Sequence, residues 1–115
     1  MNENGKVPAC SNFLPEAFHN EVMGCEGPEE VLRRICALFI RDPEETATMR
    51  RKIEGFKRLL EPRVGRVLEI RARGKGKLAR IFSAIYVGDF ASTYLGLLYD
   101  LDPSSTDSIS ALKKL

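Results

Sequence analysis

Helix start and stop signals recur along this chain at short intervals, and that spacing limits what the chain can fold into. Pro15, Pro28 and Pro43 each stand directly before an acidic residue. A proline at the first helical position and an acid in the first turn are typical of helix starts. Gly24 and Gly74 stand where such helices would end. The pattern predicts an all-α fold, a compact bundle of five to seven short helices.

Two segments carry the clearest helix signal, 28–42 and 43–61, because each begins with Pro-Glu-Glu. Pro62 removes a backbone donor, so we expect a break near Leu60 and a further helix over 62–73. Shorter helices are predicted over 15–24 and 106–115. The residues at helical spacing form the predicted core: Val31, Ile35, Phe39, Ile53, Phe56, Leu60, Val67, Ile81, Phe82, Ile85, Tyr94, Leu97 and Leu98.

The least polar stretch, residues 84–101, contains Gly88 and Asp89 near its middle. A glycine suits the left-handed end of one helix and an aspartate caps the next, so the stretch predicts an αα-hairpin. A competing β-hairpin would pair 66–73 with 78–87 across the turn Gly-Lys-Gly-Lys. The helix signals on both sides of the turn favour the αα-hairpin.

The same stretch resembles a DNA-reading helix-turn-helix, because Ala84, Gly88 and Tyr94 have the required spacing. A reader of the major groove needs Arg, Lys, Asn or Gln at the start of its second helix. This chain has Phe90 and Ala91 there. The sequence therefore favours a buried hairpin, with a degenerate helix-turn-helix as the alternative.

A membrane span is a further interpretation, since Asp89 is the only formal charge between Ile81 and Tyr99. An acid near the bilayer centre costs about 2.5 to 3.5 kcal/mol on insertion scales. Several small polar residues in the stretch add little apolar gain. The sequence thus disfavours a membrane partner and leaves the core hairpin ahead.

Charged residues are unevenly distributed along the chain. Residues 50–80 hold twelve basic and three acidic residues, a net charge of +9, whereas the remainder carries −7. Such asymmetry is typical of a polyanion-binding face or of a face that docks an acidic protein. If the helix were continuous, Arg51, Arg58, Arg66 and Arg73 would form one basic stripe.

The first hypothesis is a small protein that binds duplex or structured DNA or RNA through its phosphates. The candidate contact residues are Arg51, Arg58, Arg66, Arg71, Arg73, Lys75, Lys77 and Arg80. Base stacking is not expected, because Phe56 is the one aromatic residue in the basic segment and belongs to the predicted core. The alternative is a non-enzymatic adaptor or regulatory subunit whose basic face docks an acidic partner. The oligomeric state stays open.

Catalytic signals are weak. His19 is the only histidine, and we expect it to have a structural or surface role. Cys10, Cys25 and Cys36 are odd in number and lack Cys-x-x-Cys spacing, so no metal site and no cofactor are expected. These features predict a protein that is not an enzyme, in the cytoplasm or another reducing intracellular compartment.

One domain is expected, because the hydrophobic and charged shares, 43% and 30%, are ordinary for a globular chain of 115 residues. Residues 1–12 are polar and lack the apolar or Arg-rich pattern of a signal or transit peptide. We therefore expect a flexible tail over 1–12 and a single helical domain over 13–115.

Overall fold

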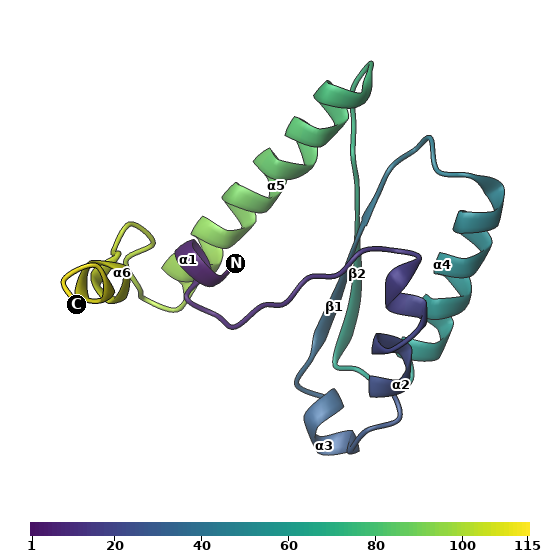
Figure 1. Ribbon diagram of the computed structural model, residues 1–115, viewed down its shortest axis with the longest axis horizontal. Coiled ribbons are helices and arrows are strands. Elements are labelled where there is room, and N and C mark those ends of the chain that lie inside the picture. The colour runs from purple at the N-terminus through teal and green to yellow at the C-terminus, as the bar shows by residue number, and fades with distance from the viewer. The chain divides into compact units, whose positions relative to one another are not determined.

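The computed structural model describes residues 1–115, which form two compact units. One unit contains residues 11–84, and the other combines residues 1–10 with residues 85–115. Figure 1 labels the elements along the chain. They are α1 Asn2–Gly5, η1 Glu16–Phe18, α2 Glu21–Gly24, α3 Glu29–Leu32, β1 Cys36–Arg41, α4 Ala47–Leu60, β2 Arg66–Arg71, α5 Lys77–Leu98 and α6 Asp107–Leu112.

The all-α prediction is wrong, because the chain contains a parallel two-stranded sheet and has an α/β fold. The helix predicted over 28–42 stops after the single turn of α3, and the apolar run that follows becomes β1. The helix predicted over 62–73 is replaced by β2. Short apolar runs fit a buried strand as well as a helix face, and tertiary pairing decides between them.

The strands pair in parallel, with Cys36 opposite Arg66 and Arg41 opposite Arg71. Parallel neighbours need a crossover connection, and α4 supplies it, so β1, α4 and β2 form a βαβ unit (Figure 1). The competing β-hairpin is wrong as well, because β2 pairs with β1 and not with 78–87. The α4 helix ends at Leu60, where Pro62 predicts a break. Its N-cap is Thr46, whose hydroxyl accepts a hydrogen bond from the Met49 amide at 3.1 Å.

The core of residues 11–84 lies between α4 and one face of the sheet. Phe39 from β1 packs there with Ile53 and Leu60 of α4, with Val64 after it, and with Cys25, which follows α2. Alternation along the strands places Leu38, Ile40 and Leu68 on the opposite face, where they are exposed. The sheet is therefore covered by this unit on one face only.

The predicted core is correct only in part. Phe39, Ile53 and Leu60 are buried, and Phe56 and Val67 pack against them. The others are exposed: Val31, Ile35, Ile81, Phe82, Ile85, Tyr94, Leu97 and Leu98. Most of these residues lie on α5, where the sequence predicts two helices packed against each other.

The αα-hairpin prediction is wrong because α5 runs without a break through Gly88 and Asp89. A glycine costs a helix only about 1 kcal/mol, so the apolar residues on either side can carry the helix through it. By length and composition α5 could also cross a membrane, with a mean hydropathy of 1.4 and only 11% of the apolar window buried. Core helices of water-soluble proteins pass the same test when they are buried.

In the unit that combines the two ends of the chain, α1 packs on α5. The Asn4 side chain donates a hydrogen bond to the Ser92 hydroxyl at 3.1 Å, and that hydroxyl donates to the Asp89 carbonyl at 2.9 Å. A Cβ at Gly96 would lie 2.5 Å from the Asn4 carbonyl oxygen. The missing side chain at Gly96 therefore lets the two backbones approach. The division into a tail over 1–12 and one domain stays a prediction.

The aromatic cluster in the core gives a stability prediction. The Phe56 ring meets Phe18 and Phe39 edge to face, with centroids 5.7 and 5.9 Å apart. Because Phe56 is only half-buried, Phe56→Ala is expected to lower the free energy of unfolding by about 2 to 3 kcal/mol. Ile40→Ala, which truncates an exposed side chain on the open sheet face, should cost about 0.5 kcal/mol or less. Urea denaturation of both variants checks the difference, and equal losses would contradict the core assignment.

Candidate functional site

The carboxyl ends of β1 and β2 meet at one edge of the sheet, because the strands are parallel and Arg41 lies opposite Arg71. In open α/β sheets this edge is the usual place for a ligand. Two loops follow the strands here, 42–46 and 72–76. Both loops and the strand ends are rich in charged residues, so this edge is a candidate site.

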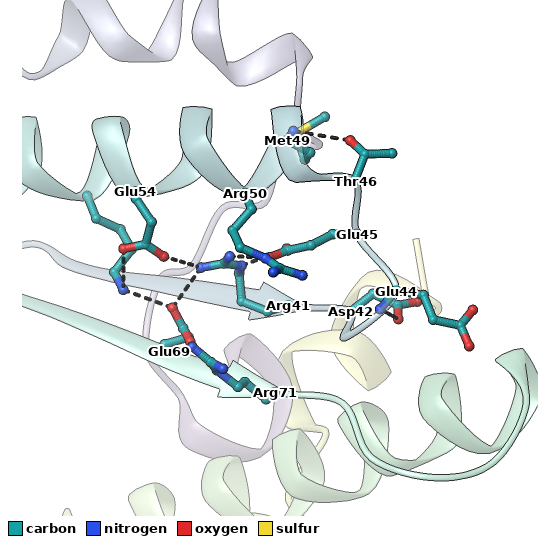
Figure 2. A network of polar contacts seen from close by, with 11 residues as sticks. Arg41, Asp42, Glu44, Glu45, Thr46, Met49, Arg50, Glu54, Glu69 and Arg71 are labelled. Atoms are coloured by element: carbon teal, nitrogen blue, oxygen red, sulfur yellow. Dashed lines mark hydrogen bonds and ion pairs between the residues drawn. The ribbon is translucent and has the colours of Figure 1, made fainter.

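Arg41 is the centre of a charged network at this edge (Figure 2). Its side chain is only 5% exposed, and its guanidinium donates to three carboxylates. Nε donates to Glu45 at 2.8 Å, and Nη2 donates to the other oxygen of the same carboxylate. Nη1 donates to Glu54 at 2.8 Å and to Glu69 at 2.9 Å. The bidentate pair fixes the loop after β1, and the two other bonds tie β1 to α4 and β2.

Lys57 and Arg71 complete the network around Glu69. Lys57 Nζ donates to Glu69 at 2.8 Å, and Arg71 Nε donates to its second oxygen at 2.6 Å. These bonds lower the pKa of Glu69 to about 2. The hydrogen bond from Arg41 likewise lowers the pKa values of Glu45 and Glu54, and the bond to Glu69 raises that of Lys57. Every carboxylate of the network is therefore ionised at neutral pH.

A second buried arginine ties the first turn of α5 to the loop after β1. Arg80 donates to both oxygens of Glu44, at 2.7 and 2.5 Å. Its Nε lies 3.0 Å from an Asp42 oxygen, an ion pair without hydrogen-bond geometry. The Glu44 amide in turn donates to Asp42 at 2.9 Å. The loop after β1 is thus held by two arginines, one from β1 and one from α5.

Glu69 makes stability depend on pH in a defined direction. Its pKa is lower in the folded protein than in the unfolded chain, so its stabilisation is complete above the unfolded pKa and disappears as the pH falls toward about 2. We expect Glu69→Gln to remove about 2 to 3 kcal/mol of the stability that the wild type loses between pH 5 and pH 2. Glu26→Gln, at an exposed carboxylate without an ion pair, should keep the full pH dependence. Urea unfolding across this range checks it, and parallel curves for wild type and Glu69→Gln would contradict it.

The structure does not arrange the sequence-predicted basic residues as one stripe. Arg51 and Arg58 are exposed on α4, and Arg66 begins β2, because the helix ends before that residue. Arg80 is buried against carboxylates, and Arg71 is exposed but pairs with Glu69. Part of the +9 charge is therefore neutralised internally. The remaining predicted residues, Arg73, Lys75 and Lys77, are exposed around the loop after β2. Phosphate binding by these side chains stays a prediction.

His19 lies in a second well-defined place, the turn between η1 and α2. Its amide donates to the Glu16 carbonyl at 2.9 Å, and its side chain is exposed. The preceding residue, Phe18, packs on Phe56 in the core. The side-chain amide of Asn12 donates a hydrogen bond to the Glu21 carboxylate across the same turn. The backbone at His19 is thus anchored while its imidazole is open to solvent.

No group of three or more histidine, cysteine or acidic side chains in the chain is arranged to hold a metal ion. A hollow of about 310 Å³ lies away from the carboxyl edge, near the amino ends of the strands. Its lining residues are Gly27, Glu29, Leu32, Arg33, Pro62 and Arg63. The charged edge and the His19 turn therefore remain the candidate sites.

Comparison with known proteins identifies the family to which the chain is similar. The family described as "Bacterial phospho-glucose isomerase C-terminal SIS domain" matches residues 1–115. A bifunctional phosphoglucose/phosphomannose isomerase of Caldicellulosiruptor bescii is 37% identical over 96% of this chain and 33% of its own length. The enzyme of the same name from Aquifex aeolicus is 31% identical over 99% of this chain and 35% of its length. No solved structure matches the chain.

These similarities overturn the functional predictions. The matching family and relatives are isomerases, so the expectation of a protein that is not an enzyme is wrong. Binding of DNA or RNA, and the adaptor that docks an acidic partner, are likewise contradicted as its function. Charge asymmetry is a weak guide here, because Arg50 and Arg80 of the basic segment pair with carboxylates outside it, those of Glu45, Asp42 and Glu44.

The chain spans about a third of the length of the curated relatives that it matches. The family match nevertheless covers every residue from 1 to 115, and the α/β fold agrees with it. The chain belongs to the family of bacterial phosphoglucose isomerase C-terminal SIS domains.

Proposed function

We propose that this chain supplies the C-terminal SIS part of an enzyme that isomerises phosphoglucose and phosphomannose. The observation that carries the proposal is the family match over the whole chain, together with 37% identity to a bifunctional relative. Relatives from Thermoplasma acidophilum and Thermoplasma volcanium bear the same name, each 30% identical over 99% of this chain.

One site can serve both sugars for a chemical reason. Glucose and mannose differ only in configuration at C2, and aldose–ketose isomerisation turns C2 into a carbonyl carbon. Both aldose phosphates therefore give the same ketose phosphate. The reaction needs a group that moves protons during ring opening and a base that carries a proton between C2 and C1.

Within this chain we assign a proton-transfer role to His19. Histidine is the side chain that enzymes use most often as a general acid or base, and His19 is the only one present. Its exposed imidazole is accessible to a sugar, and the contact between Phe18 and Phe56 fixes its backbone. This role replaces the structural one that the sequence suggested.

The charged network has a supporting role in this proposal. Arg41 and Arg80 hold the loop after β1, and both arginines are paired with carboxylates. They would therefore shape the edge of the sheet without contacting substrate. For the compartment, we propose the cytoplasm, because the relatives are metabolic isomerases and all three cysteines are free.

A chimeric enzyme tests the proposed function. This chain would replace the matching third of the Caldicellulosiruptor bescii relative, and turnover of phosphoglucose and phosphomannose would be followed by NMR of the sugar phosphates. We expect the chimera to convert both substrates to one ketose phosphate, whereas the relative without that third should be inactive. A chimera that folds by circular dichroism but converts neither sugar would contradict the proposal.

A further inference from the structure

The hollow of about 310 Å³ near the amino ends of the strands is lined by three segments of the chain. They contribute Gly27 before α3, then Glu29, Leu32 and Arg33 in and just after α3, and Pro62 and Arg63 between α4 and β2. Sites for small ligands measure about 300 to 1,000 Å³ and combine apolar walls with a few polar groups. The hollow meets both conditions, because Leu32 and Pro62 are apolar and three of its side chains are charged.

Backbone contacts hold the walls of the hollow in place. The Gly65 amide, in the turn after α4, donates to the Leu32 carbonyl at 3.1 Å and to the Ile35 carbonyl at 3.0 Å. A Cβ at Gly65 would clash with the Arg33 carbonyl oxygen, so this turn lies directly against the end of α3. Leu32, which lines the hollow, is only 7% exposed. The hollow is therefore preformed, and a ligand need not order its walls.

Arg63 presents free hydrogen-bond donors at the hollow. Its Nη1 donates to the Cys25 carbonyl at 3.0 Å, and Cys25 belongs to the buried core. This bond links the turn after α4 to the residue after α2 and fixes one end of the guanidinium. Unlike Arg33, Arg63 forms no ion pair with a carboxylate. A guanidinium has five N–H groups, so most of those on Arg63 remain for a ligand.

Arg33 and Glu29 form an incomplete ion pair at the hollow. Nε and Nη2 of Arg33 both donate to the same oxygen, Glu29 Oε1, at 3.1 Å. The Arg33 Nη1 group and the Glu29 Oε2 oxygen therefore stay free for other partners. Both side chains are exposed, and an exposed pair of this kind is weak. A ligand can thus bond to both residues without breaking a strong contact.

These donors and acceptors define the ligand. The two arginines and one glutamate give the lining a net charge of +1, which favours an anion. A guanidinium matches both phosphate and carboxylate groups, but the three terminal oxygens of a phosphate suit two arginines from two walls. The free oxygen of Glu29 needs a donor, which a hydroxyl on the ligand supplies. A small phosphate ester with hydroxyl groups satisfies all of these conditions.

We propose that the hollow is a binding site for a small phosphate ester that carries hydroxyl groups. Its phosphate lies between Arg33 and Arg63, one hydroxyl bonds to Glu29, and its carbon atoms lie against Leu32 and Pro62. The site is at the amino edge of the sheet, opposite the edge where ligands of open α/β sheets usually bind. It uses no catalytic residue, so its binding can be measured independently of the isomerase assignment.

Isothermal titration calorimetry on the full chain tests the ligand class, with glucose 6-phosphate, inorganic phosphate and glucose as probes. We expect glucose 6-phosphate to bind most tightly. Inorganic phosphate should bind about 10-fold more weakly, because it lacks a hydroxyl for Glu29, and glucose should not bind. Equal affinity for the two phosphate compounds would mean a site for free phosphate and overturn the proposed ester. Absence of binding by either of them would overturn the site itself.

Substitutions test the role of the arginine. Arg63→Met is expected to lower the affinity for glucose 6-phosphate about 10- to 100-fold, because hydrogen bonds between charged groups are strong. Arg51→Met is the matched control, since Arg51 is exposed near the start of α4 and forms no ion pair. Its affinity should equal that of the wild type, and circular dichroism checks that both variants fold. Equal losses in the two variants would indicate non-specific attraction and overturn the proposal.

Amide chemical shifts of the unmodified chain locate the ligand without any substitution. On titration with glucose 6-phosphate, the NMR signals of Gly27, Arg33 and Gly65 should shift, because these amides lie in or beside the lining. The signals of Gly74 and Gly76, in the loop after β2, should stay unchanged. Shifts confined to that loop or to the His19 turn would place the ligand elsewhere and overturn the proposal.

Discussion

His19→Gln in the chimeric isomerase is expected to lower kcat about 10²- to 10⁴-fold with both phosphoglucose and phosphomannose. Glutamine keeps a similar size and hydrogen-bonding capacity, but it cannot accept and return a proton. KM should change little, because the substitution removes a proton-transfer step and leaves the binding contacts in place. Steady-state kinetics on each sugar phosphate measures both constants.

Glu16→Gln is the matched control for this variant, since it lies in the same turn and is also exposed. Its kcat should stay close to that of the unmodified chimera. An active His19→Gln chimera would remove His19 from the mechanism while leaving the isomerase assignment intact. Loss of activity in the control as well would indicate that the turn itself had been disturbed.

Arg41→Met is expected to lower the free energy of unfolding by about 3 to 5 kcal/mol. Methionine preserves much of the side-chain volume but leaves Glu45, Glu54 and Glu69 without their shared cation. Three carboxylates would then face one another at a largely buried site. The loss should shrink as the pH is lowered toward 3, because protonation relieves the repulsion. Urea denaturation at several pH values measures both effects.

Arg33→Met is the control for this prediction. Arg33 also pairs with a glutamate, Glu29, at 3.1 Å, but the two side chains are 52% and 76% exposed. An exposed pair contributes about 0 to 1 kcal/mol, so this variant should remain close to the wild type. Equal losses in the two variants would mean that burial does not determine the strength of the Arg41 network.

The strands show where single-sequence reasoning fails. Residues 36–41 are apolar at both the helical and the strand spacing, so periodicity alone cannot assign them. Residues 66–71 also fit a strand of the competing β-hairpin, in which their partner would be the nearby segment 78–87. Their actual partner lies across a whole helix, in β1. Local signals predicted the end of α4 at Leu60 because Pro62 acts through its own backbone.

The helix end predicted at Gly88 is wrong for a related reason. A glycine followed by aspartate has the chemistry of a helix end, yet α5 continues through both residues. At Gly96, the absence of a side chain allows α1 to pack closely on α5. No local sequence pattern predicts that contact, because α1 is distant in the sequence. Ion pairs also explain the charge error, because Arg80 of the basic segment meets its carboxylates, Asp42 and Glu44, only in the folded chain.

The candidate site was harder to predict than the helices. His19 has no neighbouring cysteine, serine or metal ligand in a recognised spacing, so the sequence offered no signal beyond its being the only histidine. The family match suggests a reaction in which a histidine could transfer protons. The contact between Phe18 and Phe56 holds the backbone next to His19. The sequence shows the basic and acidic residues, but it does not show which carboxylates pair with Arg41 and Arg80.

The packing of α1 on α5 has a consequence for synthesis on the ribosome. Residues 1–10 are made before the βαβ segment, yet their contacts lie in residues 85–115, which are made after it. Translation adds about 5 to 20 residues per second, so the segment that contains β1, α4 and β2 emerges seconds before residues 85–115 and can close its core while residues 1–10 are still without partners. Among residues 1–115, the βαβ segment should therefore fold first, and residues 1–10 should be among the last to become protected from proteolysis.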